Sequence, residues 1–295
     1  MIEIIYNRKL TCGESPIWDY RNGKCFWVDA LDACIYSFDV VSQRVECHKI
    51  KSKIGSIVMH ENGSYILGGH DGLFVWDGES EPQLIMKECD GIILNNINEM
   101  IVDCYGRILI GQEVYNEDNV YEKGFLFKVD LDLKISVLEK EMSISNGMAF
   151  DTKNNKFYLI DSVDRIVYRY DYFPDEGLIS NKSRFIEFNQ NDGLPDGMTI
   201  DREGNLWIAL WFGGKICKFN NEGKLLDELK LPALQLSSLC FGGQNLNELY
   251  ITSADILWET KLAPIDFNYN NRGGETFKIS TDIYGIKENL SKLRI

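Results

Sequence analysis

Short apolar runs and polar turns alternate along the whole chain, and the pattern recurs with a period of roughly 40–50 residues. Each copy has an apolar run, a turn rich in Asp, Asn and Gly, and a second apolar run rich in aromatic and β-branched residues. Such runs are typical of sheet strands, and such turns are typical of hairpins. The turns lie at 19–23, 60–63, 103–106, 151–155, 201–204 and 242–247. The pattern therefore predicts an all-β protein without long amphipathic helices.

The repeat predicts a six-bladed β-propeller. Six copies in 295 residues leave about 49 residues for each copy, which suits a four-stranded blade. A β-sandwich with evenly spaced hairpins is the alternative, but it does not explain six similar copies, whereas radial repetition also protects strand edges. We expect one domain over residues 1–295, in which the N-terminal strand near Ile2–Tyr6 completes the last blade beside Thr276–Ile279.

Four polar residues occupy the same position in four different copies. Each lies five residues before the aspartate at the start of the following turn; they are Glu14, Asn98, Asn146 and Asp196. Because the inner strands of a propeller all run the same way along the channel, these side chains should ring one mouth of it. Two carboxylates and amide oxygens in a confined site suit a divalent ion such as Ca²⁺, Mg²⁺, Mn²⁺ or Zn²⁺. Taken singly, Asn146 and Asp196 could be turn residues before glycine, and Glu14 a solvated loop carboxylate.

Composition narrows the partners. The net charge of -14 disfavours binding to a phosphate backbone, so we expect no nucleic-acid partner. No apolar stretch reaches the length of about 20 residues that a membrane span needs, and residues 1–10 do not resemble a signal peptide. The eight cysteines form no CxxC pair, so we expect reduced thiols in a cytoplasmic protein. Propellers have no obligatory oligomeric interface, and we expect a monomer.

At these residues the chain resembles the SMP-30/gluconolactonase/luciferin-regenerating-enzyme family, also called regucalcin-like proteins. The matching motifs are CGESPIW (12–18), ISNGMAFD (144–151), YLIDS (158–162), LPDGMTID (194–201), GNLWIALWFGGKI (204–216) and CFGG (240–243). The resemblance covers almost the full chain and implies a six-bladed propeller with one divalent metal ion. It implies that Glu14, Asn146 and Asp196 bind the ion and that Asp196 is the general base. It also implies hydrolysis of a small sugar lactone to the aldonic acid, with Asn98 in contact with the substrate.

One segment departs from the family pattern. Where the family often has Arg-x-Asn-Asp-Gly, this chain has the segment 96–100, so Asn96 replaces the arginine and Glu99 the aspartate. Asparagine cannot reproduce the rigid fork of donors of a guanidinium group. We count Asn96 and Glu99 with Asn98 as candidate substrate contacts. The substrate stays open between a sugar lactone and a non-sugar lactone or ester, including an organophosphate, and a non-catalytic metal-binding propeller is a third alternative. The ion stays open among Ca²⁺, Mg²⁺, Mn²⁺, Fe²⁺ and Zn²⁺.

Two long insertions and one aromatic residue are further candidates. The loop 113–123 is polar and long for a compact repeat; it is either functional or a solvated hairpin tip. Glu113 and Glu117 are both candidates for the lid glutamate of the family. The segment 254–273 is the second insertion, and Trp211 is a candidate either for the core or for the pocket mouth.

Overall fold

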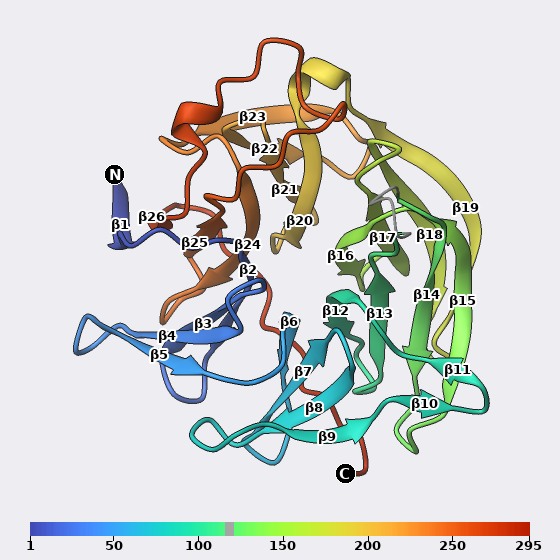
Figure 1. Ribbon diagram of the computed structural model, residues 1–295. Coiled ribbons are helices and arrows are strands. Elements are labelled where there is room, and N and C mark those ends of the chain that lie inside the picture. The colour runs from blue at the N-terminus through green and yellow to red at the C-terminus, as the bar shows by residue number, and fades with distance from the viewer. Residues whose placement is uncertain (116–120) are drawn as a thin grey trace.

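The computed structural model describes residues 1–115 and 121–295, and it forms a ring of six antiparallel four-stranded sheets around a central channel (Figure 1). The inner strands are β2 (Gly13–Asp19), β6 (Ile54–Met59), β12 (Ile97–Val102), β16 (Ser145–Asp151), β20 (Leu194–Ile200) and β24 (Leu236–Gly242). The second strands are β3 (Lys24–Asp29), β7 (Tyr65–Gly69), β13 (Ile108–Gln112), β17 (Lys156–Asp161), β21 (Leu206–Trp211) and β25 (Glu248–Ser253). The third strands are β4 (Cys34–Asp39), β8 (Gly72–Trp76), β14 (Gly124–Val129), β18 (Ile166–Phe173), β22 (Lys215–Phe219) and β26 (Thr276–Ser280). The outer strands are β5 (Arg44–Lys49), β9 (Gln83–Met86), β15 (Ile135–Met142), β19 (Leu178–Glu187), β23 (Leu225–Lys230) and β1 (Ile2–Tyr6).

The predicted six-bladed propeller is confirmed, with blades one to six taken in the order of their inner strands. The last blade is closed as expected, because β1 pairs with β26 in a register that sets Ile2 opposite Ile279. Outside the blades lie a small ribbon of β10 (Glu88–Cys89) and β11 (Ile92–Ile93) and two short 3₁₀ helices, η1 (Gln190–Asp192) and η2 (Tyr269–Asn271). Neither helix, nor any other helix in the described part of the chain, could cross a membrane.

The core lies between neighbouring blades. Ile17 and Phe26 of the first blade form one buried cluster with Ile57, Leu67 and Trp76 of the second. Both Ile57 and Leu67 are fully buried, and burial of one such side chain contributes about 1.5–3 kcal/mol. Because each blade covers apolar surface on both sides, the ring is held together by packing all the way round.

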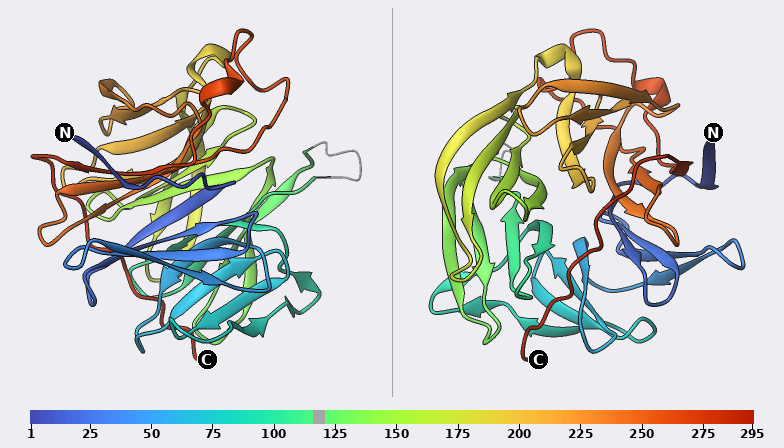
Figure 2. Two further views of the ribbon diagram at one scale, coloured as in Figure 1. Left: turned by 60° about the vertical axis from the view of Figure 1, so that its left-hand side comes forward. Right: turned by 180° about the vertical axis from the view of Figure 1, so that it is seen from behind.

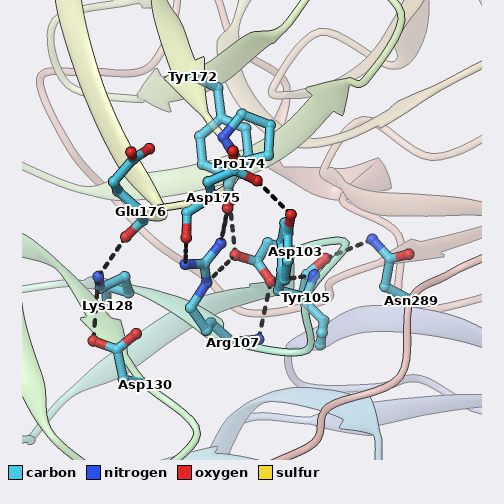
Figure 3. A network of polar contacts seen from close by, with 11 residues as sticks. Asp103, Tyr105, Arg107, Lys128, Asp130, Tyr172, Pro174, Asp175, Glu176 and Asn289 are labelled. Carbon is cyan, nitrogen blue, oxygen red and sulfur yellow. Dashed lines mark hydrogen bonds and ion pairs between the residues drawn. The ribbon is translucent and has the colours of Figure 1, made fainter.

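Buried aspartates fasten the turns that follow the inner strands. Asp103 accepts hydrogen bonds from the backbone N–H of Tyr105 (2.9 Å), the Nε of Arg107 (2.6 Å) and the hydroxyl of Tyr172 (2.6 Å) (Figure 3). Tyr172 belongs to the next blade, so this contact joins two blades. Asp19 is used in the same way, since it accepts from the hydroxyl of Tyr65 in the next blade (2.6 Å).

Residues 281–295 leave the last blade and cross the far end of the channel, as the view from behind shows (Figure 2, right). Gly285 bridges to Asp201 of the fifth blade, and Ser291 bridges to His60 of the second. Leu293 is buried against the third blade, in the cluster that contains Val102. This C-terminal segment closes the channel opposite the site described next.

Candidate active site

A cavity of about 270 Å³ opens at the end of the channel where the inner strands begin. Its lining residues are Cys12, Glu14, Ala30, Leu31, Lys53, Gly55, His70, Asn96, Ile97, Asn98, Glu113, Tyr115, Tyr121, Ile144, Asn146, Ser162, Leu194, Asp196, Trp211, Ile256 and Trp258. Five of the six predicted site residues are in this set. Glu99 instead lines a second cavity of about 380 Å³, farther along the channel and covered by the C-terminal segment at Glu288.

Bulges in the inner strands present the predicted residues to the cavity. Strand pairing shifts register between Ile97 and Glu99, between Ser145 and Met148, and between Pro195 and Met198, so Asn98, Asn146 and Asp196 have no partner in the ladder. In the first blade, Glu14 still pairs with Val28 directly before the bulge. A bulge leaves the extra residue unpaired and turns its side chain away from the regular alternation. The sequence pattern located the strands but contained no sign of these bulges.

The glycines after Asn146 and Asp196 are required by the close approach of neighbouring inner strands. A Cβ atom on Gly147 would lie 2.5 Å from the backbone N of Met198 and 2.6 Å from the backbone O of Asp196. On Gly197 it would lie 2.2 Å from the Oγ of Ser238. The glycines therefore bring the fourth, fifth and sixth blades together behind the site.

Glu14 and Asp196 form an acidic centre, and within residues 1–115 and 121–295 no ion pair joins either carboxylate to a basic side chain. Asp196 is only 5% exposed, and its Oδ1 is buried with no hydrogen-bond partner among the described residues. Burial, followed by the charges of Asp196 and Glu99, raises the pKa of Glu14 well above its usual value. Burial, followed by the charges of Glu99 and Glu113, likewise raises the pKa of Asp196. Carboxylates buried in this way are costly unless a cation or a proton compensates them.

Asn146 supplies a neutral oxygen beside this pair. Its Nδ2 donates to the Oγ of Ser162 (3.2 Å), and that hydroxyl donates to the backbone O of Pro195 (2.7 Å). The Asn146 side chain lies beside Asp196 and partly offsets the rise in the pKa of that carboxyl. Because its Nδ2 donates to Ser162, Asn146 has its carbonyl oxygen left to act as a ligand.

The residues fit a hard divalent cation. They offer carboxylate and amide oxygens only, and the orphaned Asp196 Oδ1 needs a positive partner. Across the described residues, no three His, Cys, Asp or Glu side chains gather as a metal-binding group. The third oxygen donor here belongs to an asparagine, which lies outside that set of residue types.

The altered family segment lies along one wall. Asn98 donates from Nδ2 to the backbone O of Ser145 (3.2 Å), which leaves its own carbonyl oxygen for a ligand. Asn96 has a φ of 47°, and its backbone N donates to the backbone O of His70 (3.2 Å). The Glu99 carboxylate accepts from the Oγ of Ser56 (3.3 Å), and burial raises its pKa to about 7.

Several cavity residues were not predicted. Lys53 and His70 come from the second blade, whose inner strand has Gly55 at the shared position and therefore supplies no side chain there. Glu113, by contrast, is one of the two lid candidates; it lines the cavity, and Tyr121 offsets part of the rise that burial causes in its pKa. The other lid candidate, Glu117, lies outside the described residues. Trp211 is only 7% exposed and also lines the cavity, so it belongs both to the core and to the pocket mouth.

Fold and site together define a six-bladed β-propeller with an oxygen-rich, carboxylate-bearing cavity at one channel mouth. The model of the SMP-30/gluconolactonase/LRE-like region matches residues 12–255, and the chain belongs to that family. It is 32% identical to regucalcin from Xenopus laevis over 259 residues, which cover 86% of each chain. It is 28% identical to pentonolactonase XacC from Haloferax volcanii over 286 residues, 96% of this chain and 95% of that one. A solved luciferin-regenerating enzyme matches with a TM-score of 0.88 and 27% identity over 99% of both chains.

Proposed function

We propose that this protein is a divalent-metal-dependent lactonase that opens a small sugar lactone to the aldonic acid. The observation that carries the proposal is the acidic centre of Glu14 and Asp196, in which the buried Oδ1 of Asp196 has no hydrogen-bond partner in the part of the chain that the structure describes. Similarity to a pentonolactonase over nearly the whole chain supports the substrate class.

Glu14, Asn146 and Asp196 would hold the ion. When bound, a divalent ion at this position supplies Lewis-acid polarisation of a carbonyl and compensates the two carboxylates. The cavity of about 270 Å³ has room for a small lactone, and it encloses the ligand on several sides. The experiment below distinguishes among Ca²⁺, Mg²⁺, Mn²⁺, Fe²⁺ and Zn²⁺ as the native ion.

The protein residues then divide the work of hydrolysis. Water adds to the lactone carbonyl carbon, the bond from that carbon to the ring oxygen breaks, and the ring oxygen gains a proton. Asp196 accepts the proton from the attacking water as a general base and then passes it to the ring oxygen as the bond breaks. Asn96 and Asn98 bind ring hydroxyls, and Asn98 accepts through the carbonyl oxygen that its contact with Ser145 leaves available.

A non-sugar lactone or ester is the second candidate substrate class. Asn96 stands where the family often has an arginine. The replacement removes a strong hydrogen-bond donor for the hydroxyl or carbonyl oxygens of a substrate. Trp211, Trp258 and Ile256 also give the cavity an apolar wall. Both features favour a substrate that is less hydroxylated than an ordinary aldonolactone.

The test is hydrolysis of a panel of aldono-1,4- and aldono-1,5-lactones, simple lactones and aryl esters, followed by proton release. The protein is stripped with a chelator and reconstituted separately with Ca²⁺, Mg²⁺, Mn²⁺, Fe²⁺ or Zn²⁺. We expect turnover of sugar lactones only with added metal, together with a higher melting temperature that reports binding independently of activity. Metal binding without turnover of any lactone or ester would reject the enzyme proposal and favour a binding role.

A further inference from the structure

The cavity has walls of opposite character on opposite sides of the ring. Lys53 and His70 come from the second blade, and Asn96 and Asn98 from the third. Facing them are side chains of one apolar cluster from the fifth and sixth blades: Leu194, Trp211, Ile256 and Trp258. In a ring of six, the second blade lies across from the fifth and the third across from the sixth (Figure 1). A ligand in this cavity therefore meets polar groups on one side and, on the other, this apolar cluster beside the carboxylate of Asp196.

Trp258 and Ile256 are the two parts of the apolar wall that come from the insertion 254–273, and Trp258 is the larger. Its ring stacks on Phe212 with 5.6 Å between the ring centroids and an interplanar angle of 26°. It meets Trp211 edge to face at 6.2 Å. It also meets Tyr121 edge to face at 6.2 Å, so the two long insertions of the chain touch beside the cavity. The family match ends at residue 255, and Trp258 lies beyond it.

The insertion is fixed in place by hydrogen bonds to its backbone. The Nε2 of Gln235 donates to the backbone O of Ala254 (3.0 Å) and to that of Ile256 (3.0 Å). The Nε of Arg272 donates to the backbone O of Asp255 (2.7 Å). A side chain whose backbone and ring neighbours are both held in this way discriminates between ligands, because it does not yield to a poorly fitting group.

We propose that Trp258 determines substrate specificity and selects sugar lactones whose exocyclic end is deoxygenated, with a methyl group in place of a hydroxymethyl group. The methyl group packs against Trp258 and Ile256, while the ring hydroxyls face Asn96 and Asn98. Leu194 and Ile256 have no hydrogen-bonding side-chain atom, and the indole N–H groups of Trp211 and Trp258 only donate. The hydrogen of a hydroxyl placed there therefore loses water without gaining an acceptor on this wall. This inference rests on the proposed function, because it places the lactone in the same cavity.

The test uses pairs of aldonolactones that have the same stereochemistry and differ only in the oxygen at the exocyclic end. For the metal-loaded wild-type protein we expect kcat/KM to be at least about tenfold higher for the deoxy member, mainly through KM. Trp258→Ala should reduce this ratio to within about twofold of unity by loss on the deoxy lactone. Trp258→Phe should retain most of the preference. The matched control is Leu257→Ala, the exposed neighbouring residue that does not line the cavity, and it should leave the ratio unchanged.

Equal ratios in the wild-type protein and Trp258→Ala, or a wild-type preference for the hydroxylated lactone, would overturn the inference while the lactonase proposal stands. If the wild-type protein hydrolyses neither lactone, the corresponding pair of lactams is titrated by calorimetry. A preference for the deoxy lactam that Trp258→Ala abolishes would support the inference although the lactonase proposal fails. Equal affinity for both lactams would reject it.

Discussion

The two ends of the same inner strands carry buried carboxylates in opposite circumstances. At the turn end, Asp103 is fully buried and accepts hydrogen bonds from Tyr105, Arg107 and Tyr172. At the cavity end, Asp196 is almost as deeply buried, yet its Oδ1 has no partner among the described residues. The sequence places an aspartate in both positions, but only one of them is supplied with donors.

The difference separates stability from function between the two ends of the inner strands. A buried carboxylate with a full set of donors stabilises the fold around it, and loss of one partner exposes the cost of burial. A buried carboxylate without donors raises the free energy of the empty protein and is retained where a ligand compensates it. Mutations of the aspartates at the turn end should therefore lower stability and leave activity unchanged, whereas mutation of Asp196 should lower activity without lowering stability.

The largest effect is expected for Asp196→Asn at the cavity end. Loss of the proton acceptor should lower kcat for lactone hydrolysis by about 10²- to 10⁴-fold. The free energy of unfolding of the metal-free protein should not fall, because an uncompensated buried charge is removed. Stopped assays at saturating lactone and urea unfolding give the two numbers, and undiminished kcat would refute the assignment of Asp196 as base.

Next is Asp103→Ala at the turn end. Removal of one member of the buried pair with Arg107 should lower the free energy of unfolding by about 3–5 kcal/mol. The value of kcat per folded molecule should be unchanged, since Asp103 does not line the cavity. Tyr172→Phe removes the hydroxyl that donates to Asp103 and accepts a long hydrogen bond from Arg107 (3.5 Å), and it should lower the free energy of unfolding by about 1 kcal/mol. A decrease of less than about 1 kcal/mol in the free energy of unfolding of Asp103→Ala, measured in urea, would contradict the stabilising role of Asp103.

A smaller effect is expected for Gly147→Ala, which affects both properties. The new Cβ atom would press on the backbone of Met198 and Asp196, and such overpacking costs about 1–3 kcal/mol. Because the displaced backbone carries Asp196, kcat should fall as well. Gly23→Ala is the control: no atom lies within 4 Å of its added Cβ, so it should lower only stability, by about 1 kcal/mol through its φ of 66°. Identical activity in the two variants would argue against the close approach.

The smallest effect concerns Glu288, which faces the second cavity from the C-terminal segment. Burial raises the pKa of this carboxyl to about 7. The folded protein therefore binds this proton more tightly than the unfolded chain, and the resulting stability is present at low pH and is lost as the pH rises through about 7. In Glu288→Gln the loss should be absent, so the variant should gain about 1–2 kcal/mol over the wild-type protein between pH 5 and pH 8. The exposed Glu61→Gln serves as control, and a constant difference across this range in urea unfolding would contradict the prediction.

The six-fold repeat and the shared position of four polar residues could be predicted from the sequence because both recur in several copies. Glu14, Asn98, Asn146 and Asp196 could be aligned with one another without any structure, and all four do line one cavity. Glu99 shows the limit of that reasoning. It follows Asn98 directly, but successive residues of a strand point to different sides, and it faces the second cavity instead. Its part in substrate binding stays a prediction.

Sequence alone determined the ring of six blades, the closure by the N-terminal strand and the mouth at which the carboxylates meet, since alternation and period are local properties that every copy repeats. Tertiary structure decided which features occurring only once reach that mouth. Trp258 lies in an insertion and has no counterpart in the other copies, so no period could align it with the cavity. Lys53 and His70, in contrast, occupy positions that also line the cavity in other copies, where they are held for example by Asn96 and Glu113. Tertiary structure also decided which buried carboxylates receive donors and where the C-terminal segment crosses the channel. Those outcomes depend on neighbours that are distant in sequence, and only the closed ring brings them together.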